Sequence, residues 1–163
     1  MEDISSTKSR QLGDTLESAL DPIGETLRSS RFTCETITFF RLKVELSRRL
    51  DHQDTRLARS LQAYRDLLRM NRRFDDAVSA AAESVTVWRH LYKSDQERYC
   101  GELSKSLRAY GTSLRSAKRF DEACEAGAEY VPLARHLYER DQEQHYKDLS
   151  HSLSDYGISL QKA

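Results

Sequence analysis

Leu103-Ser-Lys-Ser-Leu-Arg-Ala-Tyr110 is the stretch of sequence that decides the fold, because the chain repeats it at a constant interval. An earlier copy begins at Leu57 and a later one at Leu149, so both steps measure 46 residues. When residues 57–102 are paired with residues 103–148, 22 of the 46 positions are identical. A fixed period of this size indicates stacked supersecondary units, none of which buries its apolar face alone.

Each unit reads as two helices joined by a short turn. In the unit that begins at Leu103, apolar residues lie four, three and four positions apart as far as Leu114, which is one stripe of a helix with 3.6 residues per turn. A second stripe with the same spacing runs from Phe120 to Tyr138. The polar join at 115–119 suits an antiparallel helical hairpin. We therefore expect an all-α fold.

Two glycines stand in the middle of expected helices. Glycine costs about 1 kcal/mol relative to alanine there, so Gly111 and Gly157 predict a close approach between helices, with Gly111 facing Ala123. The preceding unit has Arg65 in place of Gly111. Either its side chain reaches outward, with the charged end in solvent, or its hairpin opens slightly.

The first 50 residues contain a fourth, degraded copy, which Pro22 interrupts. Atypical terminal repeats are expected at the ends of such arrays. Asp95 and Asp141 precede expected helices and are candidate N-caps. The resulting map has about seven helices: a disordered segment at 1–11, then one unit over 12–163 that comprises a degenerate repeat at 12–50, repeats at 54–94 and 96–140, and an unpaired helix at 142–162.

These units resemble tetratricopeptide repeats. The carriers of the resemblance are Leu107, Tyr110-Gly111, Leu114, Phe120-Asp-Glu-Ala123 and Gly127. The usual unit has roughly 34 residues, so this chain is most similar to long-period variants such as those of kinesin light chains and of large fungal and bacterial arrays. The resemblance implies an α-solenoid of antiparallel hairpins wound into a right-handed superhelix, whose first helices line a concave groove. A closed up-down bundle is disfavoured, because positions in a bundle are not equivalent and would not repeat.

Composition excludes several classes of partner. Lys+Arg and Asp+Glu both number 26, so no net basic charge is present to hold a nucleic acid. The three cysteines form no C-x-x-C pair and leave one over in any pairing, which favours reduced thiols in a cytoplasmic or nuclear protein. Neither a secretory signal nor an apolar stretch of 18 residues is visible, so no membrane span is expected.

Catalytic and metal-binding motifs are also missing from the sequence. His90 and His136 are one repeat position copied twice, and His145 and His151 are six residues apart, which does not place them on one helical face. No H-E-x-x-H, glycine-rich phosphate loop or G-x-S-x-G occurs. We therefore expect a non-enzymatic protein without metal or cofactor, which presents a surface to a protein or peptide.

The resemblance to tetratricopeptide repeats implies which residues line the groove. The candidate groove residues are Arg59, Gln62, Arg69, Lys105, Arg108, Thr112, Arg115 and His151. This set is mainly basic, whereas the second helices carry Asp75, Asp76, Glu83, Asp121, Glu122, Glu125 and Glu129. A basic groove would bind an acidic peptide. The alternative is that these charges pair with their neighbours. The asparagine-based clamp for chaperone C-termini is absent, because the only asparagine, Asn71, lies in a turn.

The last expected helix keeps an internal pattern rather than a polar outer face. Its apolar positions are Leu149, Leu153, Tyr156 and Leu160. Exposed apolar surface of this kind usually marks an interface, so the pattern predicts self-association through this helix or continuation into a longer array. The leading functional hypothesis is a protein-binding scaffold; the alternative is a structural, oligomerising segment of a repeat array without a ligand of its own.

Overall fold

The computed structural model describes residues 11, 15, 18–23, 33–50 and 55–163. The segment 1–10 and most of the first helix of the degenerate repeat lie outside these residues. The described part of the chain contains helices and short turns and no strand, which confirms the all-α prediction. Its helices are α2 (Thr33–Leu50), α3 (Thr55–Met70), α4 (Phe74–Ser94), α5 (Gln96–Ser116), α6 (Phe120–Arg140) and α7 (Gln142–Lys162).

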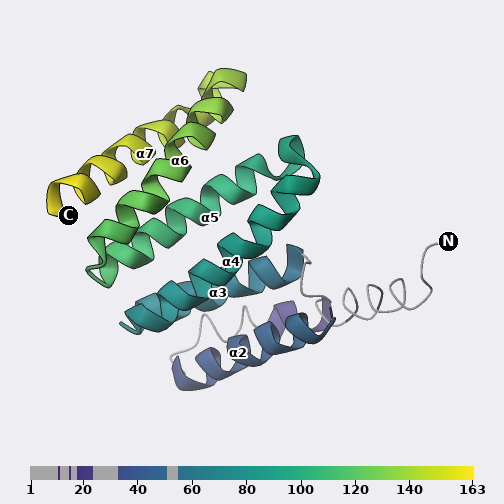
Figure 1. Ribbon diagram of the computed structural model, residues 1–163. Coiled ribbons are helices and arrows are strands. Elements are labelled where there is room, and N and C mark those ends of the chain that lie inside the picture. Colours follow the sequence, from purple (N-terminus) through teal and green to yellow (C-terminus); the bar gives the residue numbers. More distant parts are fainter. Residues whose placement is uncertain (1–10, 12–14, 16–17, 24–32, 51–54) are drawn as a thin grey trace.

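The helices form a row in which each one packs against its neighbours in the chain (Figure 1). Beyond these neighbours, α3 also contacts α5, and α5 contacts α7. In the described residues, the backbones of α2 and α4, and those of α4 and α6, do not approach each other in this way. Thus α3, α5 and α7 lie closest together and share one face, and α2, α4 and α6 form the other layer.

One hydrophobic core runs along the row. Trp88 of α4 is fully buried in it, against leucines of α3 and α5 and beside Tyr99, whose ring centroid lies 6.0 Å away. The core extends from Val44 of α2 to Tyr130 and Ala134 of α6. Apolar burial on this scale is the main stabilising term of the fold.

The helix starts follow the sequence. The side chains of Asp95 and Asp141 accept hydrogen bonds from the backbone amides of Arg98 and Gln144, each at 3.0 Å. Both residues therefore act as N-caps, as predicted. The same device appears 46 residues apart because the sequence that encodes it is repeated.

The two hairpin turns place a non-glycine residue in the left-handed region. Arg72 has φ 58° and Lys118 has φ 61°. The amide of Arg119 donates to the carbonyl of Leu114 at 2.9 Å, and that of Lys118 donates to the carbonyl of Arg115 at 3.0 Å. This is a Schellman motif, in which glycine is preferred at the left-handed position because a Cβ is strained there.

Replacing Lys118 with glycine should therefore stabilise the protein. We expect a gain of about 1 kcal/mol in the free energy of unfolding, because the strain of the left-handed lysine is relieved. Urea unfolding monitored by circular dichroism measures it. Glu125→Gly, at an exposed position inside α6, is the control and should destabilise by about the same amount; a loss at both positions would contradict the prediction.

The close approach between helices occurs at a different glycine from the two predicted. A Cβ at Gly157 would meet nothing within 4 Å, and one at Gly111 would meet only the end of the Arg115 side chain at 3.9 Å. A Cβ at Gly127 would lie 2.6 Å from Cδ2 of Tyr156. The prediction for Gly111 and Gly157 is wrong, and Gly127 is the residue that lets α6 and α7 approach.

Arginine–glutamate pairs connect the helices of the second layer. Arg48 of α2 donates through Nε to Glu83 of α4 at 2.8 Å, and Arg89 of α4 donates through Nε to Glu129 of α6 at 3.0 Å. Both arginines bind both carboxylate oxygens, and this hydrogen bonding raises the pKa of each guanidinium. The two glutamates are 46 residues apart and occupy one repeat position, whereas the two arginines are 41 residues apart. Each pair nevertheless connects one helix of this layer to the next.

Candidate peptide-binding face

The face shared by α3, α5 and α7 contains two clefts on either side of Lys105 and Arg108. The larger cleft, about 490 Å³, lies between the N-terminal half of α5, the C-terminal half of α6 and the start of α7. The smaller, about 240 Å³, lies between α3 and α5. We call the smaller cleft the α3/α5 pocket. It is lined by Arg65, Asp66, Arg69, Lys105, Arg108, Ala109 and Thr112.

The α3/α5 pocket brings together four of the predicted groove residues, namely Arg69, Lys105, Arg108 and Thr112. Four of its seven lining residues are cationic and one is acidic. Three of these cations pair with carboxylates: Arg65 with Asp66, Lys105 with Glu102, and Arg108 with Asp148. Arg69 is the cation of this pocket that has no carboxylate partner among the described residues, so it is the one available to attract an external carboxylate.

Three predicted groove residues line neither cleft. Arg59 and His151 are exposed, and Gln62 is half-buried. The eighth, Arg115, points inward to a small cavity between α5, α6 and α7, and its side chain is only 19 % exposed. The predicted set is therefore split between an open pocket, the exposed surface and the interior.

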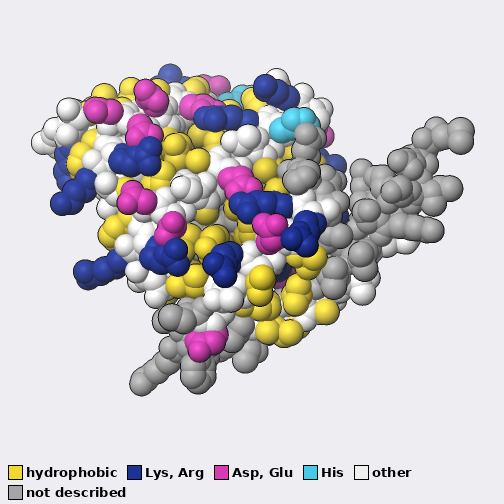
Figure 2. All heavy atoms as spheres, turned by 60° about the horizontal axis from the view of Figure 1, so that its bottom comes forward, with side chains coloured by type: hydrophobic (Ala, Val, Ile, Leu, Met, Phe, Trp, Pro, Cys, Tyr) yellow, Lys and Arg dark blue, Asp and Glu magenta, His cyan; other side chains and the backbone are white. Residues whose placement is uncertain are grey.

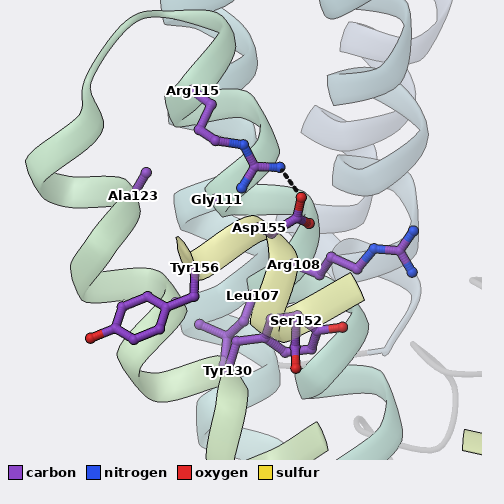
Figure 3. A pocket seen from close by; sticks show the side chains of 10 residues that line it. Leu107, Arg108, Gly111, Arg115, Ala123, Tyr130, Ser152, Asp155 and Tyr156 are labelled. Carbon is purple, nitrogen blue, oxygen red and sulfur yellow. Dashed lines mark ion pairs between the residues drawn. The ribbon is translucent and has the colours of Figure 1, made fainter. Parts of the chain in front are cut away.

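Two of the predicted groove arginines form ion pairs with carboxylates of α7. Arg115 pairs with Asp155 at 2.9 Å, as Figure 3 shows, and Arg108 pairs with Asp148 at 3.3 Å. For these two residues the alternative interpretation, pairing with neighbours, is the one that applies. Both pairs join residues 40 apart, so the matching seven-residue spacing of the arginines and of the aspartates was the signal that could have identified them in the sequence.

Tyr130 supports the same part of the face. It is buried, and its hydroxyl donates to the backbone carbonyl of Asp148 at 3.1 Å. Burial raises its pKa to about 12, so the hydroxyl keeps its proton at neutral pH. The bond ties α6 to the part of α7 that carries Asp148, and thereby positions the carboxylate that meets Arg108.

The side chain of Arg65 does not reach outward. It is only 13 % exposed, and its guanidinium lies along the pocket, with Nη2 2.8 Å from Asp66. Its Nε is buried and has no hydrogen-bond partner. A buried donor without a partner is uncommon and costs free energy, so the wall of the α3/α5 pocket contains an unsatisfied donor.

Acidic residues of the second layer are largely neutralised by arginines. Besides the pairs that connect helices, Arg73 binds Asp76 and Arg119 binds Glu122 at the starts of α4 and α6. Figure 2 accordingly shows residues of both signs interspersed over one face of the molecule. Four of the seven carboxylates that the sequence places on the second helices are thus paired with arginines, namely Asp76, Glu83, Glu122 and Glu129.

The four apolar residues predicted for self-association divide into two pairs. Leu149 packs against the core, and Tyr156 packs on Gly127. Leu153 and Leu160 are 49 % and 55 % exposed. Self-association through them stays a prediction.

Within the described residues, no cluster of histidine, cysteine and carboxylate side chains is arranged to bind a metal ion. No described helix combines the length and apolarity that crossing a bilayer requires. Comparison with known proteins yields no matching family model, curated protein or solved structure.

Proposed function

We propose that this chain is a tetratricopeptide-like scaffold that binds an acidic segment of a partner protein along the face of α3, α5 and α7. The repeated helical hairpins and the contact of first helix with first helix support this assignment. Its function is binding rather than catalysis, in keeping with a face that offers arginines, a lysine and a threonine. The α3/α5 pocket is the centre of the binding surface.

The main support for the proposal is that the same repeat position holds a paired arginine on α5 and an unpaired arginine on α3. Arg115 of α5 receives the carboxylate of Asp155 from α7. Arg69 stands 46 residues before Arg115, and the residue 46 before Asp155 is Ala109. Arg69 and Ala109 both line the α3/α5 pocket, and no carboxylate of the described residues pairs with Arg69. The chain thus fills one arginine site with its own carboxylate and leaves the equivalent site open.

The energetics favour an external carboxylate in that place. A guanidinium and a carboxylate form charge-assisted hydrogen bonds that are stronger than neutral ones. Arg65 stands in the same wall with its Nη2 held by Asp66, so Arg69 is the guanidinium that meets the ligand. Because the pocket is open to solvent, the attraction should weaken as salt screens it.

Binding of an acidic peptide should depend on Arg69. The probe is a fluorescein-labelled peptide of alternating glutamate and alanine, with a glutamine counterpart as the uncharged control. We expect salt-sensitive binding of the glutamate peptide, measured by fluorescence anisotropy. Arg69→Glu should weaken it about tenfold, because attraction becomes repulsion. Ala109→Asp should weaken it similarly by supplying an internal carboxylate.

Arg41→Glu is the matched control, since it makes the same charge change at an exposed position of α2, outside the two clefts. It should leave the affinity of the glutamate peptide unchanged. Equal binding of the glutamine peptide, or equal losses in Arg69→Glu and Arg41→Glu, would count against the proposal. Charge reversal at Arg108 or Arg115 would be a poorer test, because a glutamate at either position would face an aspartate and destabilise the fold.

A further inference from the structure

The end of the row formed by α6 and α7 has an uncovered stripe of residues on α7. At helical spacing, five exposed residues follow one another: Tyr146, Ser150, Leu153, Gly157 and Leu160. Their equivalents on α5, 46 residues earlier, are all buried: Cys100, Ser104, Leu107, Gly111 and Leu114. Three of the five positions are apolar in both helices, and the serine and glycine are retained. We call the exposed set the α7 stripe.

On α5 the equivalent stripe is covered by small residues of α6. Leu114 packs in one cluster with Ala123 and Ala126. Further along, Leu107 lines a small cavity together with Ala123 and Gly127 (Figure 3). Helices approach closely where one side of the contact is built from small residues. The α7 stripe therefore has the form of a surface that accepts a helix with a face like that of α6.

An unpaired arginine of α6 also favours a helix that resembles α6 at this surface. In the second layer, Arg48 binds Glu83, and Arg89 binds Glu129 on the next helix of that layer. Arg135 of α6 stands 46 residues after Arg89 and is exposed. No carboxylate of the described residues pairs with it. Arg135 thus occupies the repeat position of Arg89 but has no counterpart of Glu129 to bind.

We propose that the edge formed by α6 and α7 binds an amphipathic helix of a partner protein. This helix lies antiparallel to α7, as α6 does to α5, with small residues against Leu153 and Leu160. One of its carboxylates binds Arg135. The apolar stripe provides most of the affinity, and the arginine sets the register of the bound helix.

A second copy of the chain fits this surface less well. Among the described helices, α4 and α6 have the required face of small residues, and both already bury it within the row. The stripe of α7 itself carries Tyr146, Leu153 and Leu160, so it offers large residues rather than small ones. The carboxylates of α7 nearest the core, Asp148 and Asp155, are held by arginines of α5.

The test uses the full chain and a synthetic probe, the blocked and labelled peptide with the sequence of residues 120–140. This peptide carries the face of small residues and the carboxylate of Glu129. We expect it to bind, with Leu153→Asp in the protein lowering the affinity at least tenfold. Arg135→Glu in the protein should lower it about fivefold, Glu129→Arg in the probe should do the same, and combining the two should restore binding.

Controls separate this surface from the α3/α5 pocket, because the probe is acidic overall. An affinity that Arg69→Glu lowers and Leu153→Asp leaves unchanged would show that the probe binds in the pocket and would overturn the proposal. Absence of binding at several hundred micromolar probe would also overturn it. So would a dimer in sedimentation that Leu153→Asp dissociates, since the stripe would then belong to a second copy. The variants lie on the surface, and circular dichroism verifies that they fold.

Discussion

Leu107→Ala should destabilise the protein by about 2–5 kcal/mol. Leu107 is 1 % exposed and belongs to the core that spans α2 to α6, so truncation removes buried apolar surface and leaves a cavity between α5 and α6. Because neighbouring side chains are held in place from both sides, the cavity should collapse only in part. Urea unfolding at equilibrium measures the loss.

The control is the equivalent leucine of α7. Leu153 is 49 % exposed, so Leu153→Ala should change the free energy of unfolding by no more than about 1 kcal/mol. Two leucines of the same repeat position thus differ because a helix covers one and none covers the other. Similar losses at both positions would mean that Leu153 is covered in solution, by a second copy or by a different packing of the chain.

Gly127→Ala is the second substitution with a large expected effect. The new Cβ would lie 2.6 Å from Cδ2 of Tyr156, 3.3 Å from Cγ and 3.4 Å from its Cβ. The ring and the α6–α7 contact must then shift, which costs about 1–3 kcal/mol. The better helix propensity of alanine offsets at most about 1 kcal/mol of this. Thermal or urea unfolding should show a net loss of stability.

Gly157→Ala should have the opposite sign. Its Cβ would meet no atom within 4 Å, so the helix propensity of alanine should stabilise α7 by up to about 1 kcal/mol. Stabilisation by both substitutions would mean that α6 and α7 separate without penalty. The preceding repeat has an alanine at the position of Gly127, namely Ala81, and a tyrosine, Tyr110, at the position of Tyr156. An alanine beside a tyrosine is therefore compatible with the spacing of that earlier pair of helices, and the measurement decides whether it is compatible with the spacing of α6 and α7.

Much of the fold could be predicted from local sequence. The spacing of leucines from Leu103 to Leu114 indicates a helix, and Asp95 and Asp141 indicate where two helices begin. Leucine spacing and N-capping depend only on residues within one or two helical turns, so the sequence alone is sufficient to predict them. The error at Gly111 arose because helix separation depends on side chains of another helix. Gly127 meets Tyr156 only once α6 and α7 are packed, and nothing within either helix indicates the distance.

The candidate site was less predictable than the fold for the same reason. Repeat position placed Arg69, Lys105, Arg108 and Thr112 on one face, and the structure brings them to one pocket. Position alone did not indicate that Arg108 and Arg115 are already paired. Their partners lie 40 residues away on α7, and finding them requires knowing that α5 and α7 are neighbours. Charge along a single helix therefore overestimates how many arginines are available to a ligand.

The restriction of contacts to neighbouring helices has a consequence for how the chain folds. Contacts between helices mostly join helices that are adjacent in the chain, so little chain entropy is lost in closing long loops before native contacts form. Chains with low contact order fold quickly, and folding of a row can start at any hairpin and spread to its neighbours. Amide hydrogens should therefore exchange slowest in α4 and α5, which are covered on both sides, and fastest in α7, which opens without disturbing the other helices.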